Sequence, residues 1–269
     1  MEDLNTAPHA GSITAEHLAE LAQAKQLLEN PGYVSRVTDM IGMPLEAAVN
    51  KLPAAVKARI ADLTTASLGK CMDVASATLR GGAERPATRL HSAAVALTGA
   101  AGGVFGLAGL AVELPVTTVL MLRSIADIGR ANGEAIGSTE AQLACLMVFS
   151  LGGPSKADDA AESGYYAARI ALSKAIAEAS SYLTKNTLGK HSAPAIVRLI
   201  SMIAARFNVQ VSQKAAAMMV PIVGAAGGAV LNTLFINHFQ DMARGHFTVR
   251  RLERAYGAEA VRAAYQALG

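Results

Sequence analysis

AAVALTGAAGGVFGLAGLAVELPVTTVLML, residues 93–122, is a glycine-rich apolar tract that carries a single charge, Glu113. A second tract, residues 215–236, repeats the pentapeptide GAAGG and carries no charge. Each tract reaches the roughly 20 apolar residues that a helix needs to cross a bilayer. What these tracts bury against therefore decides both the fold and the function.

The two pentapeptides, Gly99–Gly103 and Gly224–Gly228, place small residues four apart, a spacing that lets helix backbones approach closely. Pro115 and Pro221 interrupt a simple membrane span, and the chain has no tryptophan to mark a membrane interface. Basic residues flank both ends of each tract and give no orientation bias. Two interpretations stay open: a tightly packed hairpin in a peripheral or soluble protein, and a hairpin inserted into the membrane.

The composition favours helices throughout. Of the 269 residues 52% are apolar and only 4% are aromatic, and no segment alternates as a strand does. We expect an all-α multi-helix bundle built around two glycine-rich apolar helical hairpins. We expect residues 1–50 to form a partly disordered N-terminal extension with one helix, capped by Thr14, and residues 51–269 to form the main helical domain.

Proline, glycine and capping residues predict several helix ends. Pro115 is expected in the first turn of a helix, where its missing N–H costs nothing, and Gly133 is expected just beyond the end of that helix. Thr139 with Gln142 predicts a capping box for the next helix. Pro194 predicts the start of a later one.

Charge and cysteine usage narrow the class of protein. The net charge of +3 comes from dispersed basic residues with few aromatic neighbours, so we expect no nucleic-acid partner. The N-terminus lacks the basic and apolar segments of a secretory signal, so we expect a cytoplasmic protein at the inner face of the cell membrane. Cys71 and Cys145 lie in apolar surroundings and are expected as buried thiols.

Polar residues that follow the first tract form one candidate constellation. Glu113 is expected just ahead of a helix, where the positive end of the helix dipole stabilises a carboxylate. Arg123, Asp127 and Arg130 share one helical face. They form either an exposed ladder of ion pairs or a buried pair that locks two helices together.

The stretch after the second tract is the other constellation. Asn232 begins a segment whose polar side chains recur on one helical face. Carboxylates and histidines from both constellations could form a metal site between helices, although the paired Glu-x-x-His motif of such bundles is absent. The candidates for this metal site are Glu113, Asp127, His238, Asp241 and His246.

Arg250, Arg251 and Arg254 cluster near the C-terminus. They form either a solvated helix face or a surface for anionic lipid headgroups. The chain has no GxSxG, Walker A, HExxH or CxxC motif, so no catalytic residue is assigned, no cofactor is expected, and whether the protein is an enzyme stays open.

Three blocks of the sequence resemble the EcsC protein family: residues 112–134, residues 158–172 and residues 220–257. The likeness is most specific in the third, VPIVGAAGGAVLNTLFINHFQDMARGHFTVRRLERAYG. The resemblance implies a bacterial helical protein. The family takes its name from an operon that also encodes an ABC transporter involved in secretion and processing, so the resemblance implies a link to a membrane and supplies no catalytic residues.

We therefore expect a non-enzymatic, membrane-associated helical protein that binds lipid or another apolar ligand and is linked to transport or secretion. The alternatives are a soluble metal-assisted hydrolase and a structural partner of an ABC transporter, and a homo-oligomer stays open. The expected ligand- or lipid-binding residues are Gly99, Gly103, Glu113, Arg123, Asp127, Gly224, Gly228, Asn232, Arg250, Arg251 and Arg254.

Overall fold

A computed structural model describes residues 12–30, 32–78, 107–153, 164–185, 193–220 and 224–268. These residues form ten α-helices and one 3-10 turn, and no strand occurs among them, which confirms the all-α prediction. The elements are α1 (Ala15–Glu29), α2 (Tyr33–Ile41), α3 (Leu45–Asn50), α4 (Ala54–Thr78), α6 (Leu107–Ala131), α7 (Thr139–Met147), η1 (Val148–Ser150), α8 (Gly164–Lys185), α9 (Pro194–Met218), α10 (Gly224–Tyr256) and α11 (Ala258–Ala267).

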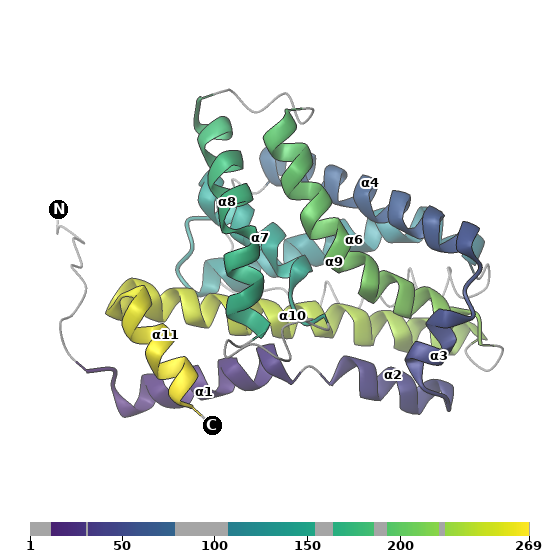
Figure 1. Ribbon diagram of the computed structural model, residues 1–269, viewed down its shortest axis with the longest axis horizontal. Coiled ribbons are helices and arrows are strands. Elements are labelled where there is room, and N and C mark those ends of the chain that lie inside the picture. The colour runs from purple at the N-terminus through teal and green to yellow at the C-terminus, as the bar shows by residue number, and fades with distance from the viewer. Residues whose placement is uncertain are drawn as a thin grey trace.

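The 33-residue helix α10 is the axis of the bundle. At 1.5 Å per residue it is about 50 Å long. Helix α1 lies along one side of it and α6 contacts another side, while α11 turns back from its end toward α1 (Figure 1). The backbones of α1 and α10 approach closely at Gly245, where an added Cβ would lie 3.0 Å from the Ala24 carbonyl oxygen. No residue larger than glycine fits this crossing unless the helices move apart.

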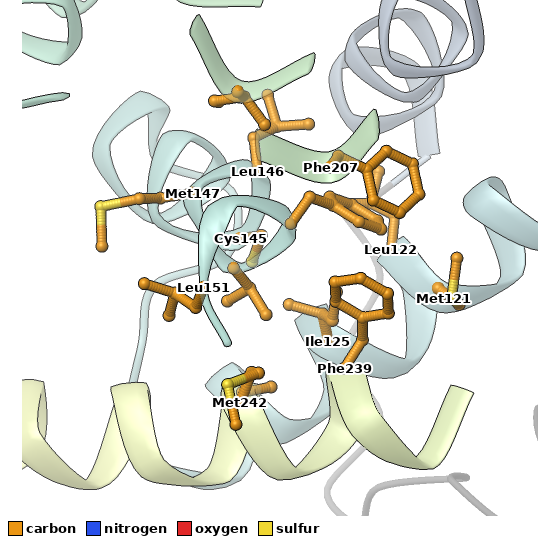
Figure 2. Packing of buried hydrophobic residues seen from close by; sticks show 14 of the residues in the cluster. Met121, Leu122, Ile125, Cys145, Leu146, Met147, Leu151, Phe207, Phe239 and Met242 are labelled. Atoms are coloured by element: carbon orange, nitrogen blue, oxygen red, sulfur yellow. The ribbon is translucent and has the colours of Figure 1, made fainter. Parts of the chain in front are cut away.

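The remaining long helices form a second layer over α10. Helix α9 packs against α4 and α8, and α4 packs along α6 (Figure 1). Between the layers Phe149, Phe207 and Phe239 meet in a triangle of rings whose centroids lie 5.0 to 5.4 Å apart. Figure 2 shows Phe207 and Phe239 beside Leu122 and the buried Cys145. Aromatic and aliphatic contacts thus join α6, α9, α10 and η1 into one core.

Several predicted helix ends are confirmed. The Thr14 hydroxyl accepts a hydrogen bond from the His17 backbone N–H at 3.2 Å and so caps α1. Helix α6 ends at Ala131, and Gly133 follows in the left-handed region at φ +79°. Helix α9 begins at Pro194. The capping box is wrong, because Ser138 caps α7 by accepting from the Ala141 N–H at 3.2 Å.

The expected place of Pro115 is also wrong. Helix α6 begins at Leu107, so Pro115 lies inside it and not in its first turn. A proline there removes the hydrogen bond to the carbonyl four residues earlier, which costs about 3 kcal/mol in an isolated helix. The fully buried side chains of Leu114 and Met121 on the same helix offset this cost through tertiary packing.

The two pentapeptides have different outcomes. Gly224–Gly228 forms the first turn of α10. Gly99–Gly103 lies outside the described residues, so the two glycine-rich hairpins are not confirmed. The boundary near residue 50 stays a prediction, although α1 packs directly on α10.

Candidate functional site

The most unusual feature of the core is a buried ion pair between α6 and α9. Lys214 Nζ donates a hydrogen bond to Glu113 Oε1, and the two side chains are only 1% and 3% exposed. The prediction that Glu113 lies just ahead of a helix is therefore wrong. Glu113 lies inside α6, because that helix begins at Leu107, and its charge is balanced by a lysine 101 residues away in the chain.

An aromatic ring of α10 lies beside this pair. Lys214 Nζ lies 5.0 Å from the centroid of the Phe235 ring, which gives the ammonium group a second favourable contact. Burial lowers the pKa of Lys214, and the carboxylate of Glu113 opposes that shift. Among the described residues, Glu113 Oε2 has no hydrogen-bond partner. Removing one partner of such a pair leaves an uncompensated buried charge, which costs about 3 to 5 kcal/mol.

Exposed apolar side chains lie close to Glu113 and Lys214 in the sequence and recur at the start of α10. Val112 and Val116 lie one turn apart on α6 and are 75% and 46% exposed. Met219, directly after α9, is 47% exposed, and Val230 on the second turn of α10 is 51% exposed. We call these four side chains the apolar end. Figure 1 shows that α9 ends where α10 begins, so two of the three elements meet there.

Two helices are long and apolar enough to cross a membrane by length and composition. They are residues 109–131 of α6 and 194–218 of α9, and 56% and 50% of their most apolar windows are buried inside the protein. Core helices of a soluble protein pass the same test, so this finding alone does not define a span. About half of the residues in each of these apolar stretches are thus buried within the bundle.

The three C-terminal arginines all pair with carboxylates of the same chain. Arg250 donates to both oxygens of Glu134 at 2.8 and 3.2 Å. Arg254 also donates to Glu134, and Arg251 lies 2.5 Å from Glu20 of α1. Their headgroup role stays a prediction, and it would require lipid phosphates to replace these carboxylates.

Glu134 is the centre of this network. Its side chain is only 5% exposed. Burial by itself would raise the pKa of Glu134, but hydrogen bonds and charge from Arg250 and Arg254 outweigh burial and lower it below the usual value. The network therefore joins the segment after α6 to the last turns of α10 with an ionised carboxylate.

The polar face predicted after the first tract is only partly assembled. Asp127 accepts from Arg130 at 2.8 Å, three residues along the same helix, and Arg123 is exposed. The side chains of this pair are only 19% and 15% exposed, so the structure does not show the exposed ladder that was one of the two interpretations. Asn232, on α10, is fully buried.

The five metal candidates do not come together. No group of three or more histidine, cysteine, aspartate or glutamate side chains suited to a metal ion occurs among the described residues. Glu113 pairs with Lys214, and Asp241 accepts from Arg244 at 2.6 Å. His246 Nδ1 lies 2.9 Å from the Tyr165 hydroxyl, in a fully buried contact.

Sequence reasoning missed the partner of Glu113, although a signal was present. Lys214 is the only charged residue between Arg206 and Asp241, and Glu113 is the only one between Arg89 and Arg123. Two lone opposite charges in apolar tracts would each be costly unless paired, and this predicts their contact. Sequence reasoning also missed Glu253, which accepts two hydrogen bonds from Arg169 at 2.6 and 2.9 Å, because its position beside α8 is set only by the fold.

The sequence profile of the EcsC protein family matches residues 19–252. The chain belongs to the EcsC protein family. No curated protein and no solved structure matches it. The matched part of this EcsC protein includes most of α1, both lone charges and Arg250, whereas Arg254 and α11 fall outside it.

Proposed function

We propose that this EcsC protein is a non-enzymatic, membrane-associated protein that contacts lipid through its apolar end. The observation that supports the proposal is the place of four exposed apolar side chains, which lie within a few residues of Glu113 or Lys214 or on the first turns of α10. Of the seven large hydrophobic side chains that are exposed among the described residues, four belong to the apolar end. A contiguous exposed apolar patch is typical of a membrane or protein interaction site, whereas scattered single residues are not.

The free energy gained on membrane contact is large enough for reversible binding. Full burial of a valine or methionine side chain stabilises by about 1.5 to 3 kcal/mol, and the four side chains are only partly exposed. Together they supply several kcal/mol, which is comparable to the contribution of a single acyl chain that anchors a protein reversibly. Such binding is peripheral and reversible.

The buried ion pair gives this surface a fixed shape. Val112 and Glu113 are neighbours in α6, one exposed and the other buried. The bond from Lys214 to Glu113 fixes α6 against α9 directly behind the exposed valines. A pair that favours one packing over others is the best-attested use of buried charge, and here it would hold the apolar end together outside the membrane.

A peripheral position fits the helices better than a span does. About half of each apolar window is already buried by other helices, so neither α6 nor α9 presents lipid with an apolar surface all round. We place the protein at the inner face of the cell membrane, where a link to transport or secretion is part of the same proposal.

Vesicle flotation tests this proposal. Wild-type protein is expected to float with vesicles of phosphatidylcholine and equally with vesicles that also contain phosphatidylglycerol. Val112→Asp with Val116→Asp should lower the floated fraction at least tenfold, since two charges must then enter the apolar interface. Val197→Asp is the matched control, because Val197 is 48% exposed but lies about 33 Å from Met219 along α9.

Two outcomes would contradict the proposal. Wild-type protein that stays unbound on both kinds of vesicle at low salt removes lipid contact and leaves a partner protein, such as a transporter subunit, for the apolar end. Equal loss of flotation in Val197→Asp and in the double variant would show that the effect does not arise at the apolar end.

A further inference from the structure

The start of α6, residues 107–114, lies ahead of Pro115, and we call it the α6 arm. Because proline has no N–H, one carbonyl group of the arm loses the donor that a helix gives it. The hydroxyls of Thr117 and Thr118 both donate to the Leu114 carbonyl oxygen, at 3.1 and 2.6 Å. Threonine hydroxyls bonded back to helix carbonyls weaken and often bend a helix, as proline does. Three residues thus weaken α6 within one turn, so a hinge is expected there.

The α6 arm is attached to the rest of the bundle by few side chains. Leu110 and Leu114 are buried, at 2% and 0% exposed. Glu113 is the only polar side chain of the arm, and it accepts the hydrogen bond from Lys214 of α9. Val112, the residue before Glu113, is 75% exposed. Any polar side-chain contact between the arm and another helix therefore depends on Glu113.

The carboxylate of Glu113 depends in turn on a single cation. Among the described residues, its Oε2 accepts no hydrogen bond, so Lys214 is the main group that stabilises its charge. A buried charge that loses its partner is strongly destabilising. A swing of the arm about Pro115 relieves that cost, because it carries the carboxylate toward the solvent that Val112 already contacts.

We propose that the α6 arm is hinged at Pro115 and latched by Lys214, and that this latch keeps the charge of Glu113 out of the apolar end. With the pair intact, Val112 is exposed and the carboxylate beside it is buried. Separation of the pair brings the carboxylate to the surface next to Val112, where a charge opposes lipid contact. This control of lipid contact rests on the proposed function, whereas the hinge and the latch do not require lipid.

Hydrogen exchange of the lipid-free protein, resolved along α6, tests the hinge and the latch. Lys214→Met is expected to raise amide exchange in residues 108–114 at least tenfold, and much less in residues 119–131 beyond the hinge. Lys214→Met with Glu113→Gln should restore slow exchange, since no buried charge then lacks a partner. Pro115→Ala in the otherwise wild-type chain should slow exchange of the arm several-fold, because alanine restores the missing N–H.

Leu122→Ala is the matched control for a general loss of stability. Leu122 is fully buried on α6 beyond the hinge, and its truncation destabilises by leaving a cavity without moving a charge. It is expected to raise exchange on both sides of Pro115 alike. The latch is overturned if Lys214→Met raises exchange as evenly as Leu122→Ala does, or if it leaves the arm at the wild-type rate. Unchanged exchange of the arm in Pro115→Ala overturns the hinge.

Flotation with phosphatidylcholine vesicles tests the control of lipid contact. Lys214→Met is expected to float at least tenfold less than the wild type, and Lys214→Met with Glu113→Gln as well as the wild type does. If Lys214→Met floats like the wild type although its arm exchanges rapidly, the control of lipid contact is overturned. Wild-type protein that does not float overturns the proposed function and this control with it, while hydrogen exchange still decides on the latch.

Discussion

The two halves of α10 differ in how many charged residues they contain. Residues 224–239 contain no Asp, Glu, Lys or Arg, whereas residues 240–256 contain six. Around the first half a single buried ion pair, Lys214 with Glu113, lies behind exposed valines. Around the second half the arginines pair with carboxylates from α1 and the segment after α6, and Glu253 pairs with Arg169 of α8.

This difference separates two uses of ionic contacts. In the second half, the pairs range from the mostly buried Arg250 with Glu134 to the partly exposed Arg251 with Glu20, and solvent screens the exposed ones. Beside the first half, one fully desolvated pair has a high desolvation cost, and no water is present to replace a lost partner. The charged side chains of the second half thus all form ion pairs within the protein, whereas exposed apolar side chains lie on and near the uncharged half.

The largest expected effect is at the buried pair. Lys214→Met alone should lower the free energy of unfolding by about 3 to 5 kcal/mol, because the charge of Glu113 is then buried without a partner. Lys214→Met with Glu113→Gln should recover most of that loss. Urea unfolding of both variants measures this, and a double variant no more stable than the single one would show that packing and not charge is lost.

The next effect is the response of α10 to acid. Burial lowers the pKa of His238 to about 4, so the unfolded chain binds a proton between pH 6.5 and 4 that the folded protein does not. Stability should therefore fall as pH drops through this window, by about 3 kcal/mol from His238 alone. His238→Gln should remove that part of the dependence. A curve unchanged in the variant would contradict a buried neutral imidazole.

A smaller effect is expected from Glu134 in the charged half. Glu134→Gln should lower the free energy of unfolding at neutral pH by about 2 kcal/mol, because charge-assisted hydrogen bonds from Arg250 and Arg254 are weakened. The folded pKa of Glu134 lies below its unfolded value, so its contribution is complete above pH ~4.5 and is lost as pH falls through the folded pKa. Wild type and variant should converge in acid. A constant difference at all pH values would mean that the carboxylate charge is not involved.

The smallest effect is expected from Arg251. Its side chain and that of Glu20 are 34% and 38% exposed, so the pair is screened by water. Arg251→Gln should cost less than about 1 kcal/mol by thermal or urea unfolding, and added salt should reduce even that. A loss as large as that of Glu134→Gln would remove the distinction between buried and exposed pairs within α10.

The fold class and several helix ends could be predicted from local chemistry, because caps such as Thr14 and Gly133 act within a few residues. The position of Pro115 inside α6 could not be predicted, since tertiary packing around α6 outweighs the local preference of proline for the first turn. The contact of Glu113 with Lys214 could have been predicted from the two isolated charges in the sequence. A cavity beside His238 could not be predicted, because α1 and α2 form it together with α10, which lies far from them in the sequence.

Flotation of two variants side by side tests the central claim, that lipid contact lies at the uncharged half and not at the arginines. Val112→Asp with Val116→Asp is compared with Arg251→Gln with Arg254→Gln on vesicles that contain phosphatidylglycerol. We expect the valine variant to lose binding at least tenfold while the arginine variant stays within about twofold of the wild type. Loss of binding in the arginine variant, with the valine variant still floating, would contradict it.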